Sequence, residues 1–206
     1  MSRTSAERAP RTLTREEQVS ALSATADRAE GYRDHVLISL ALATGIREHE
    51  IAALDVSDVY HSNRGVRDRI RLRTFKGDGR DGAPSSQEVF ASERLREKLS
   101  RFMSWKRRRG EPTSGDSPLF LSARKQRIST RTIRHLWREV QKRAGFADPL
   151  FTFHALRHTA IQNVYDATRD LRLAQRFARH ADIQTTTIYA APGDDRVRAA
   201  VDSLPC

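Results

Sequence analysis

Three short stretches of the sequence carry residue types that could act together on one anion. The first, Thr44-Gly-Ile-Arg47, ends in an arginine; the second, His154-Ala-Leu-Arg157, pairs an imidazole with a guanidinium; the third begins at His180 and ends at Tyr189. Guanidinium groups bind phosphate oxygens in a bidentate manner. A tyrosine hydroxyl is a poor nucleophile unless neighbours orient it and stabilise the charge that it creates. These stretches are therefore candidates for the groups that would surround Tyr189.

The arginine of the first stretch has a functional and a plain interpretation. Gly45 frees the backbone, and Arg47 then begins a helical turn, where a guanidinium beside free amide groups could hold a phosphate. Arg47 could equally be a surface arginine that is paired with Glu50 or Asp55. The sequence alone leaves both interpretations open.

The second stretch has a metal-binding alternative. On a helix, His154 and Arg157 share a face and could address one anion together. His158 lies four residues after His154, a spacing at which two histidines can bind zinc. Zinc proteases have a glutamate where this chain has Ala155, and the charge of Arg157 would repel the cation. We therefore expect no metal, while a purely structural His154 remains open.

The elements that must position these residues are mainly helical. Thr14 and Glu17 fit a capping box at a helix start, and Gly45 fits the end of a helix over residues 33–44. The third stretch needs only a short helix or turn between His180 and Tyr189. A short helix is expected to end near residue 54. Further helices are expected at residues 92–109, 130–144, 154–167, 171–178 and 194–203.

A β-hairpin interrupts the helices. Residues 69–75 alternate charged and apolar side chains, which predicts a half-exposed strand. Residues 76–82 form a glycine-rich turn that begins with Lys76, and residues 87–90 could return as the partner strand. The expected fold class is therefore mainly α with a small antiparallel β-hairpin (α+β).

Composition favours a polyanionic partner. The 206 residues carry a formal net charge of +11, which favours a partner such as nucleic acid or an anionic membrane surface, although a ribosome-associated or merely basic protein would look the same. We expect a flexible basic arm over residues 1–12 and one domain over residues 13–206. Since no apolar run or signal core occurs, a cytoplasmic protein without membrane contact is expected. Cys206 is the only cysteine, which excludes a disulfide framework.

These motifs, in this order, resemble those of the tyrosine recombinase family, also called the phage integrases, from about residue 12 to the end. The family has an arginine after Thr-Gly, then His-x-x-Arg, then a histidine nine residues before a tyrosine. It also places a lysine in a β-hairpin after the first arginine. The matching residues are Arg47, Lys76, His154, Arg157, His180 and Tyr189. Two positions depart from the family pattern: Arg179 replaces the usual glycine, and Ala155 replaces a frequent acidic residue.

The resemblance implies a mechanism that needs no metal, cofactor or ATP. Tyr189 would attack a DNA phosphodiester and leave a 3′-phosphotyrosine and a free 5′-hydroxyl. Arg47, Arg157 and His180 would stabilise the charge on the phosphate oxygens, Lys76 would protonate the departing oxygen, and His154 would position Tyr189 or accept its proton.

The resemblance also implies partners. These are double-stranded DNA and, on paired DNA sites, a homotetramer in which residues 194–206 contact a neighbour; a free monomer is expected. Family members usually carry an N-terminal core-binding domain, which we expect this sequence to lack. A type IB topoisomerase and a non-catalytic DNA-binding regulator remain alternatives.

Overall fold

Helices dominate the computed structural model, which describes residues 11–26, 30–63, 65–73, 87–147, 151–180, 182–190, 198 and 201–202. The described helices are α1 (Arg15–Ser23), α2 (Gly31–Thr44), α3 (Glu48–Ala53), α4 (Val56–Val59), α5 (Glu93–Arg108), α6 (Thr130–Arg143), α7 (His154–Thr168), α8 (Leu171–Ala178) and α9 (Gln184–Thr187). Strands β1 (Arg69–Leu72) and β2 (Gln87–Phe90) form one antiparallel sheet. The prediction of a mainly α chain with a small hairpin is confirmed. Two compact units result, one spanning Arg11–Ala160 and one beginning at Ile161.

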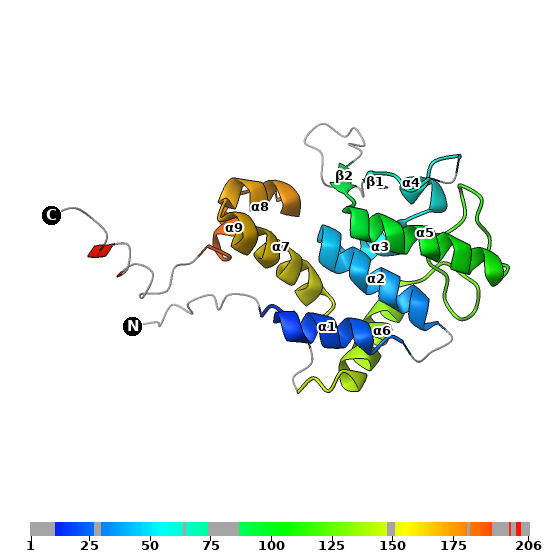
Figure 1. Ribbon diagram of the computed structural model, residues 1–206, viewed down its shortest axis with the longest axis horizontal. Helices are drawn as coiled ribbons and strands as arrows, with labels where there is room; N and C mark the ends of the chain where they lie inside the picture. The colour runs from blue at the N-terminus through cyan, green and yellow to red at the C-terminus, as the bar shows by residue number, and fades with distance from the viewer. Residues whose placement is uncertain are drawn as a thin grey trace. The chain divides into compact units, whose positions relative to one another are not determined.

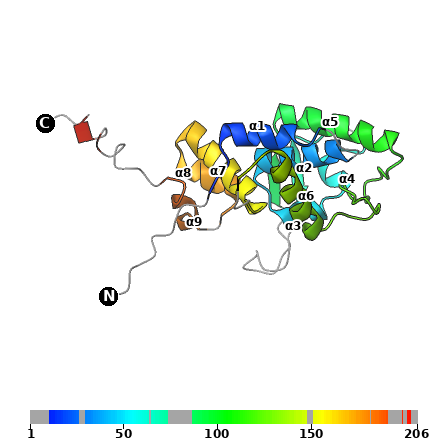
Figure 2. The same cartoon turned by 90° about the horizontal axis from the view of Figure 1, so that it is seen from below.

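The larger unit is organised around α2. This helix buries most of its length, including Val36, Leu37 and Leu40. Helices α5 and α6 lie on opposite sides of α2 in both views (Figure 1, Figure 2). Among the helices that the structure describes, none is both long and apolar enough to cross a bilayer.

Side-chain caps fix where the helices of the larger unit begin. Thr14 and Glu17 form the predicted capping box at the start of α1. Ser92 and Ser129 accept hydrogen bonds from backbone amides in the first turns of α5 and α6. Such caps are worth about 1 kcal/mol each, because they satisfy amide groups that the helix leaves free.

The sheet has the predicted alternation. Ile70 and Leu72 of β1 are buried, while Arg69 and Arg71 point to solvent. The strands pair in register from Arg69 opposite Phe90 to Leu72 opposite Gln87. The turn expected at residues 76–82, with Lys76, lies outside the described residues.

One buried carboxylate joins three segments of the larger unit. Asp55, between α3 and α4, is 4% exposed and accepts hydrogen bonds from Arg73, after β1, and from Arg127. Arg127 also donates to the main-chain carbonyls of Ala53 and Leu54, both at 3.1 Å, where α3 ends. Arg73 makes a second ion pair with Asp58 at 3.6 Å. The end of α3, the end of β1 and the segment before α6 are thus held by two shared guanidinium groups.

The smaller unit contains the end of α7 with α8 and α9. Asp170 caps α8 by accepting from the amides of Arg172 and Leu173, so α8 begins and ends where the sequence predicted. The buried core of the smaller unit consists of Ile161, Tyr165, Ala174, Ala178 and Tyr189. Of the helix expected over residues 194–203, only residues 198, 201 and 202 are described, and they are helical.

Candidate active site

The turn between α2 and α3 places Arg47. Gly45 ends α2 in the left-handed conformation (φ 61°), which glycine adopts without steric cost, and its amide bonds to the carbonyl of Ala41 at 2.9 Å. Ile46 is then buried at 1% exposure, and Arg47 becomes the N-cap residue of α3. The guanidinium therefore stands at the start of a helix, as the sequence predicted.

Glu50 fixes the orientation of Arg47. The Glu50 carboxylate accepts from the Arg47 amide at 2.6 Å and from its guanidinium at 3.3 Å. The Glu50 side chain is 6% exposed, whereas that of Arg47 is 30% exposed. Pairing with Glu50, which the sequence offered as the plain alternative, is therefore real, but part of the guanidinium still faces solvent. Asp55 instead binds Arg73 and Arg127.

Arg157 is anchored on the same turn. Its side chain, on α7, is buried at 3% exposure and donates a hydrogen bond to the main-chain carbonyl of Gly45. Arg157 therefore contacts the three-residue turn, residues 45–47, that ends in Arg47. A buried guanidinium with a defined partner is already oriented, so it loses little entropy when it binds an anion.

His154 lies at the start of α7, within the influence of both arginines. Desolvation by the surrounding protein and the positive charges of Arg157 and Arg47 lower its pKa, and the charge of Glu48 raises it by a smaller amount. Since the ordinary value is about 6.5, the ring is neutral at pH 7 and can accept a proton. Its ring meets that of His158 edge to face at 4.7 Å between centroids. Within the described ranges, no group of three or more His, Cys, Asp or Glu side chains is placed to hold a metal ion.

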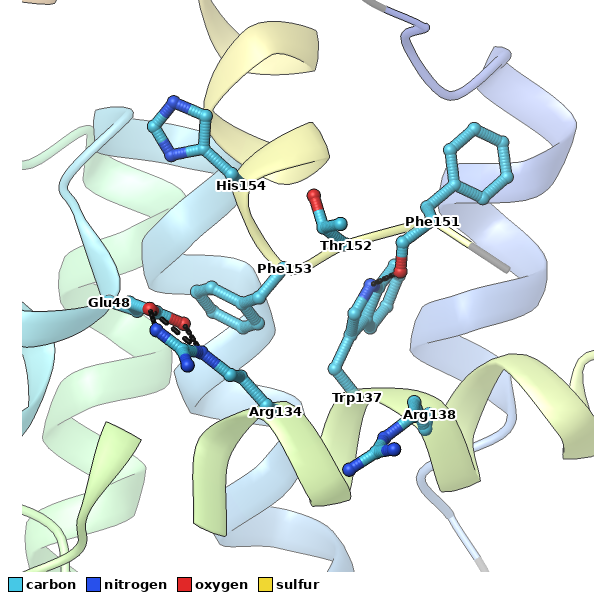
Figure 3. A pocket seen from close by; sticks show the side chains of 8 residues that line it. All are labelled: Glu48, Arg134, Trp137, Arg138, Phe151, Thr152, Phe153 and His154. Carbon is cyan, nitrogen blue, oxygen red and sulfur yellow. Dashed lines mark hydrogen bonds and ion pairs between the residues drawn. The ribbon is translucent and has the colours of Figure 1, made fainter. Parts of the chain in front are cut away.

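A pocket of about 760 Å³ opens beside His154 (Figure 3). Three aromatic residues, Trp137, Phe151 and Phe153, are among those that line it, and Trp137 donates through Nε1 to the carbonyl of Phe151 at 3.0 Å. At its edge, Arg134 of α6 forms an ion pair with Glu48 at 2.9 and 3.0 Å. The lining residues are Glu48, Arg134, Trp137, Arg138, Phe151, Thr152, Phe153 and His154. Sequence reasoning missed this pocket, although the basic residues at helical spacing in α6 were a usable signal.

His180 and Tyr189 lie in the smaller unit. The Nδ1 atom of His180 is 2.9 Å from the hydroxyl of Thr186, a fully buried residue of α9. The predicted short helix between His180 and Tyr189 is thus α9, and it supplies the partner that orients the imidazole. Tyr189 is 5% exposed and packs in the unit's core, and its carbonyl accepts from Gln162 at 3.5 Å.

Arg179 adopts a glycine-like backbone. It ends α8 in the left-handed conformation (φ 56°, ψ 41°), which costs a residue with a β-carbon about 1 kcal/mol. Although Arg179 stands where the family usually has glycine, the backbone before His180 keeps the left-handed conformation that glycine favours. This conformation strains the arginine backbone locally.

The structure thus brings together Arg47, His154 and Arg157 in the larger unit and holds His180 and Tyr189 in the smaller one. Lys76 lies outside the described residues, between Arg73 and β2.

Comparisons with known proteins identify the family of this chain. The model of the phage integrase family matches residues 12–196. Tyrosine recombinase XerC of Corynebacterium glutamicum is 32% identical over 179 residues, which cover 86% of this chain and 53% of the relative. Tyrosine recombinase XerD of Ralstonia nicotianae is 34% identical over 195 residues, covering 93% and 59%. The chain spans about half the length of the curated relatives that it matches.

Solved structures show the same fold. The crystal structure of XerA recombinase superposes with a TM-score of 0.72 at 26% identity, covering all of this chain and 68% of that one. The XerH recombinase bound to its difH substrate superposes with a TM-score of 0.72 at 20% identity, covering 98% and 56%. With its catalytic-domain fold and a family match over most of its length, this chain belongs to the phage integrase family of tyrosine recombinases.

Proposed function

We propose that this chain is the catalytic part of a site-specific DNA recombinase that cleaves and rejoins DNA through a 3′-phosphotyrosine intermediate. The observation that carries this proposal is the contact of Arg157 with the Gly45 carbonyl, next to the Glu50-held Arg47. Two oriented guanidinium groups can stabilise the charge that builds on phosphate oxygens in the transition state, a role that metal ions fill in other enzymes. The chemistry therefore needs neither a metal nor ATP, because the phosphotyrosine keeps the energy of the broken bond.

The residues of this chain can supply every proton transfer that the cleavage step needs. The Tyr189 oxygen attacks phosphorus and gives its proton to His154, which is neutral at pH 7 because its pKa is lowered. The bond from phosphorus to the 5′-oxygen breaks, and Lys76 gives that oxygen a proton. His180, whose Nδ1 lies 2.9 Å from the Thr186 hydroxyl, donates a hydrogen bond from its Nε2–H group to a phosphate oxygen in the tautomer in which Thr186 donates to Nδ1. Rejoining reverses these steps with a 5′-hydroxyl from another strand.

Double-stranded DNA is the proposed substrate. The net charge of +11 suits a phosphate backbone. Two of the similar solved structures, XerH and the Tn1549 transposon integrase, are complexes with DNA. A type IB topoisomerase would use the same cleavage chemistry but rejoin the original strand, and a non-catalytic regulator would need no nucleophile. The relatives, which are recombinases, favour strand exchange. We place the reaction in the bacterial cytoplasm.

A nicked suicide substrate tests this function directly. Cleavage next to the nick releases a short fragment that cannot rejoin, so the protein stays covalently attached and shifts in a denaturing gel. Tyr189→Phe should abolish the adduct, while Tyr165→Phe, which removes one oxygen from the same buried core, should retain it. Adduct formation by Tyr189→Phe, or a requirement for Mg²⁺ or Zn²⁺ after EDTA treatment, would contradict the proposal.

We further propose that the chain is a monomer when free and assembles as a homotetramer on paired DNA sites. Strand exchange between two duplexes requires four cleavages, and Val201 in the C-terminal segment is 58% exposed, so it is available to a neighbour. Deleting residues 194–206 should spare binding to a single site and eliminate the paired-site complex in sedimentation. Formation of that complex without the segment would assign the segment to packing within its own chain.

A further inference from the structure

Helix α5 presents a row of arginines on its outer side. Arg94, Arg101 and Arg108 are exposed and follow one another at intervals of seven residues, so they form one stripe with a spacing of about 10.5 Å. Within the part of the chain that the structure describes, none of the three side chains makes a hydrogen bond or ion pair. We call this row the arginine stripe.

The arginine stripe borders a second pocket, of about 430 Å³. It is lined by Tyr32, Ser100, Arg101, Ser104, Trp105 and Arg108. Its two aromatic rings are half-buried and held in place. Tyr32 donates to the carbonyl of Lys98 at 3.3 Å, and Trp105 stacks on Phe102 with 5.5 Å between centroids.

This surface lies on a different helix from the Arg47 part of the candidate active site. Arg47 is at the start of α3, which contacts α6, whereas α5 packs on α2. In both views α5 is on the side of α2 opposite α6 (Figure 1, Figure 2). DNA held at Arg47 and His154 would therefore leave the arginine stripe exposed.

We propose that the arginine stripe and its aromatic pocket form a docking surface for an acidic α-helix of a partner protein. A partner helix lying along α5 would carry carboxylates every seven residues, at the same spacing of about 10.5 Å as the stripe. One apolar side chain of that helix would fill the pocket against Tyr32 and Trp105, and the serine hydroxyls would take part in polar contacts at its edge. Aromatic and arginine side chains are the types enriched at the energetic centres of such interfaces.

Glu97 favours a protein over a nucleic acid. It is exposed on α5 one turn before Arg101, between Arg94 and the pocket. A phosphate backbone that followed the stripe would meet this carboxylate and be repelled. A helix with mixed charge can instead place a lysine or arginine opposite it, so Glu97 would also set the register of the partner.

The same helix offers a matched control. Arg96 and Arg107 are also exposed, but at 100° per residue they lie on a different side of α5 from the arginine stripe. The double variants Arg101→Glu/Arg108→Glu and Arg96→Glu/Arg107→Glu change the net charge equally. Each also places one glutamate in the last turn, so any helix-dipole penalty is matched.

The probe is a synthetic helical peptide with glutamate every seven residues and leucine beside the central glutamate. Its binding to the full chain is measured by calorimetry, with Trp105 fluorescence as a second signal. We expect saturable binding that weakens at least tenfold in Arg101→Glu/Arg108→Glu and in Trp105→Ala but is unchanged in Arg96→Glu/Arg107→Glu. Thermal unfolding establishes that each variant is folded, and the suicide-substrate adduct should persist in both double variants.

Three outcomes would overturn the proposal. One is the absence of saturable peptide binding up to about 1 mM, a concentration at which even a weak interface would be detected. Another is an equal loss in the two double variants, which would mean that net charge alone attracts the peptide. The third is a single-stranded oligonucleotide that binds more tightly than the peptide and depends on Arg101 and Arg108, which would assign the surface to nucleic acid.

Discussion

The buried guanidinium of Arg157 donates a hydrogen bond to the main-chain carbonyl of Gly45, two residues before Arg47. One candidate phosphate-binding residue therefore supports the turn that presents the other. Because the contact is made to the backbone, it depends on the geometry of the guanidinium and on the path of the turn, and only weakly on which side chains surround it.

Replacing Arg157 by lysine should separate charge from geometry. Lysine keeps the charge but has no planar fork, so the buried Gly45 carbonyl would lose its partner. We expect adduct formation on the suicide substrate to fall at least about 100-fold. The free energy of unfolding should fall by about 1–3 kcal/mol. Arg96→Lys, an exposed change on α5, is the control. Near-normal cleavage by Arg157→Lys would show that charge suffices.

Glu50→Gln should reduce catalysis more than binding. The amide can still accept one hydrogen bond from Arg47, but it lacks the charge that holds the guanidinium. We expect single-turnover cleavage to slow by at least about tenfold, with little change in a gel-shift measurement of DNA affinity. Glu139→Gln removes an exposed carboxylate that pairs with Lys142 and should change neither quantity. Equal losses of binding and cleavage would contradict a positioning role.

The pKa of His154 should respond to Arg47. In the folded chain this pKa lies below the ordinary value of about 6.5, so the folded state resists protonation of His154. Because the unfolded chain takes up that proton more readily, the free energy of unfolding decreases as the pH falls below about 6.5. Removing a nearby cation with Arg47→Gln should raise the pKa, as measured by NMR titration of the imidazole Cε1 proton. His154→Asn assigns the signal. Arg96→Gln should leave it in place, and an unmoved signal in Arg47→Gln would contradict the electrostatic effect of Arg47 on this imidazole.

Arg179→Gly should stabilise the protein. Glycine adopts the left-handed conformation without the clash of a β-carbon, so the free energy of unfolding should rise by up to about 1 kcal/mol. Arg179→Ala keeps the β-carbon and should show no gain. A loss of stability in Arg179→Gly would mean that side-chain contacts outweigh the strain. A loss of cleavage despite higher stability would assign a phosphate contact to the arginine.

Lys76→Ala should be impaired in protonating the departing 5′-oxygen. It should cleave a normal phosphodiester poorly but recover on a substrate with sulfur at the bridging 5′ position, because a thiolate departs without protonation. DNA affinity should change little. Poor cleavage of both substrates would show that another residue is the acid, or that Lys76 acts through the structure of its segment.

The sequence predicted most helices because their ends carry local signals. Helix α8 follows Asp170 and α1 follows Thr14, both of which cap through their own side chains. The sequence did not predict α4, because a helix of four residues is too short to show a hydrophobic period.

The candidate site was predicted less completely. Its residues could be named from spacing, but the buried hydrogen bond from Arg157 to the Gly45 carbonyl could not, because it is long-range and involves a backbone atom. The sequence offered pairing of Arg47 with Glu50 or Asp55 as the alternative to a functional arginine. The structure shows that the same pair leaves the guanidinium partly exposed, so the contact is compatible with function.

The shared carboxylate of Asp55 has a consequence for mutational tolerance. If either Arg73 or Arg127 is lost, the other still compensates the buried charge of the Asp55 carboxylate. Either arginine can therefore be substituted as long as the other is kept. Loss of Asp55 has no such substitute, because it would leave two guanidinium groups facing each other at the end of α3. Two positions that look dispensable when changed singly therefore become essential as a pair, which is a form of epistasis centred on one side chain.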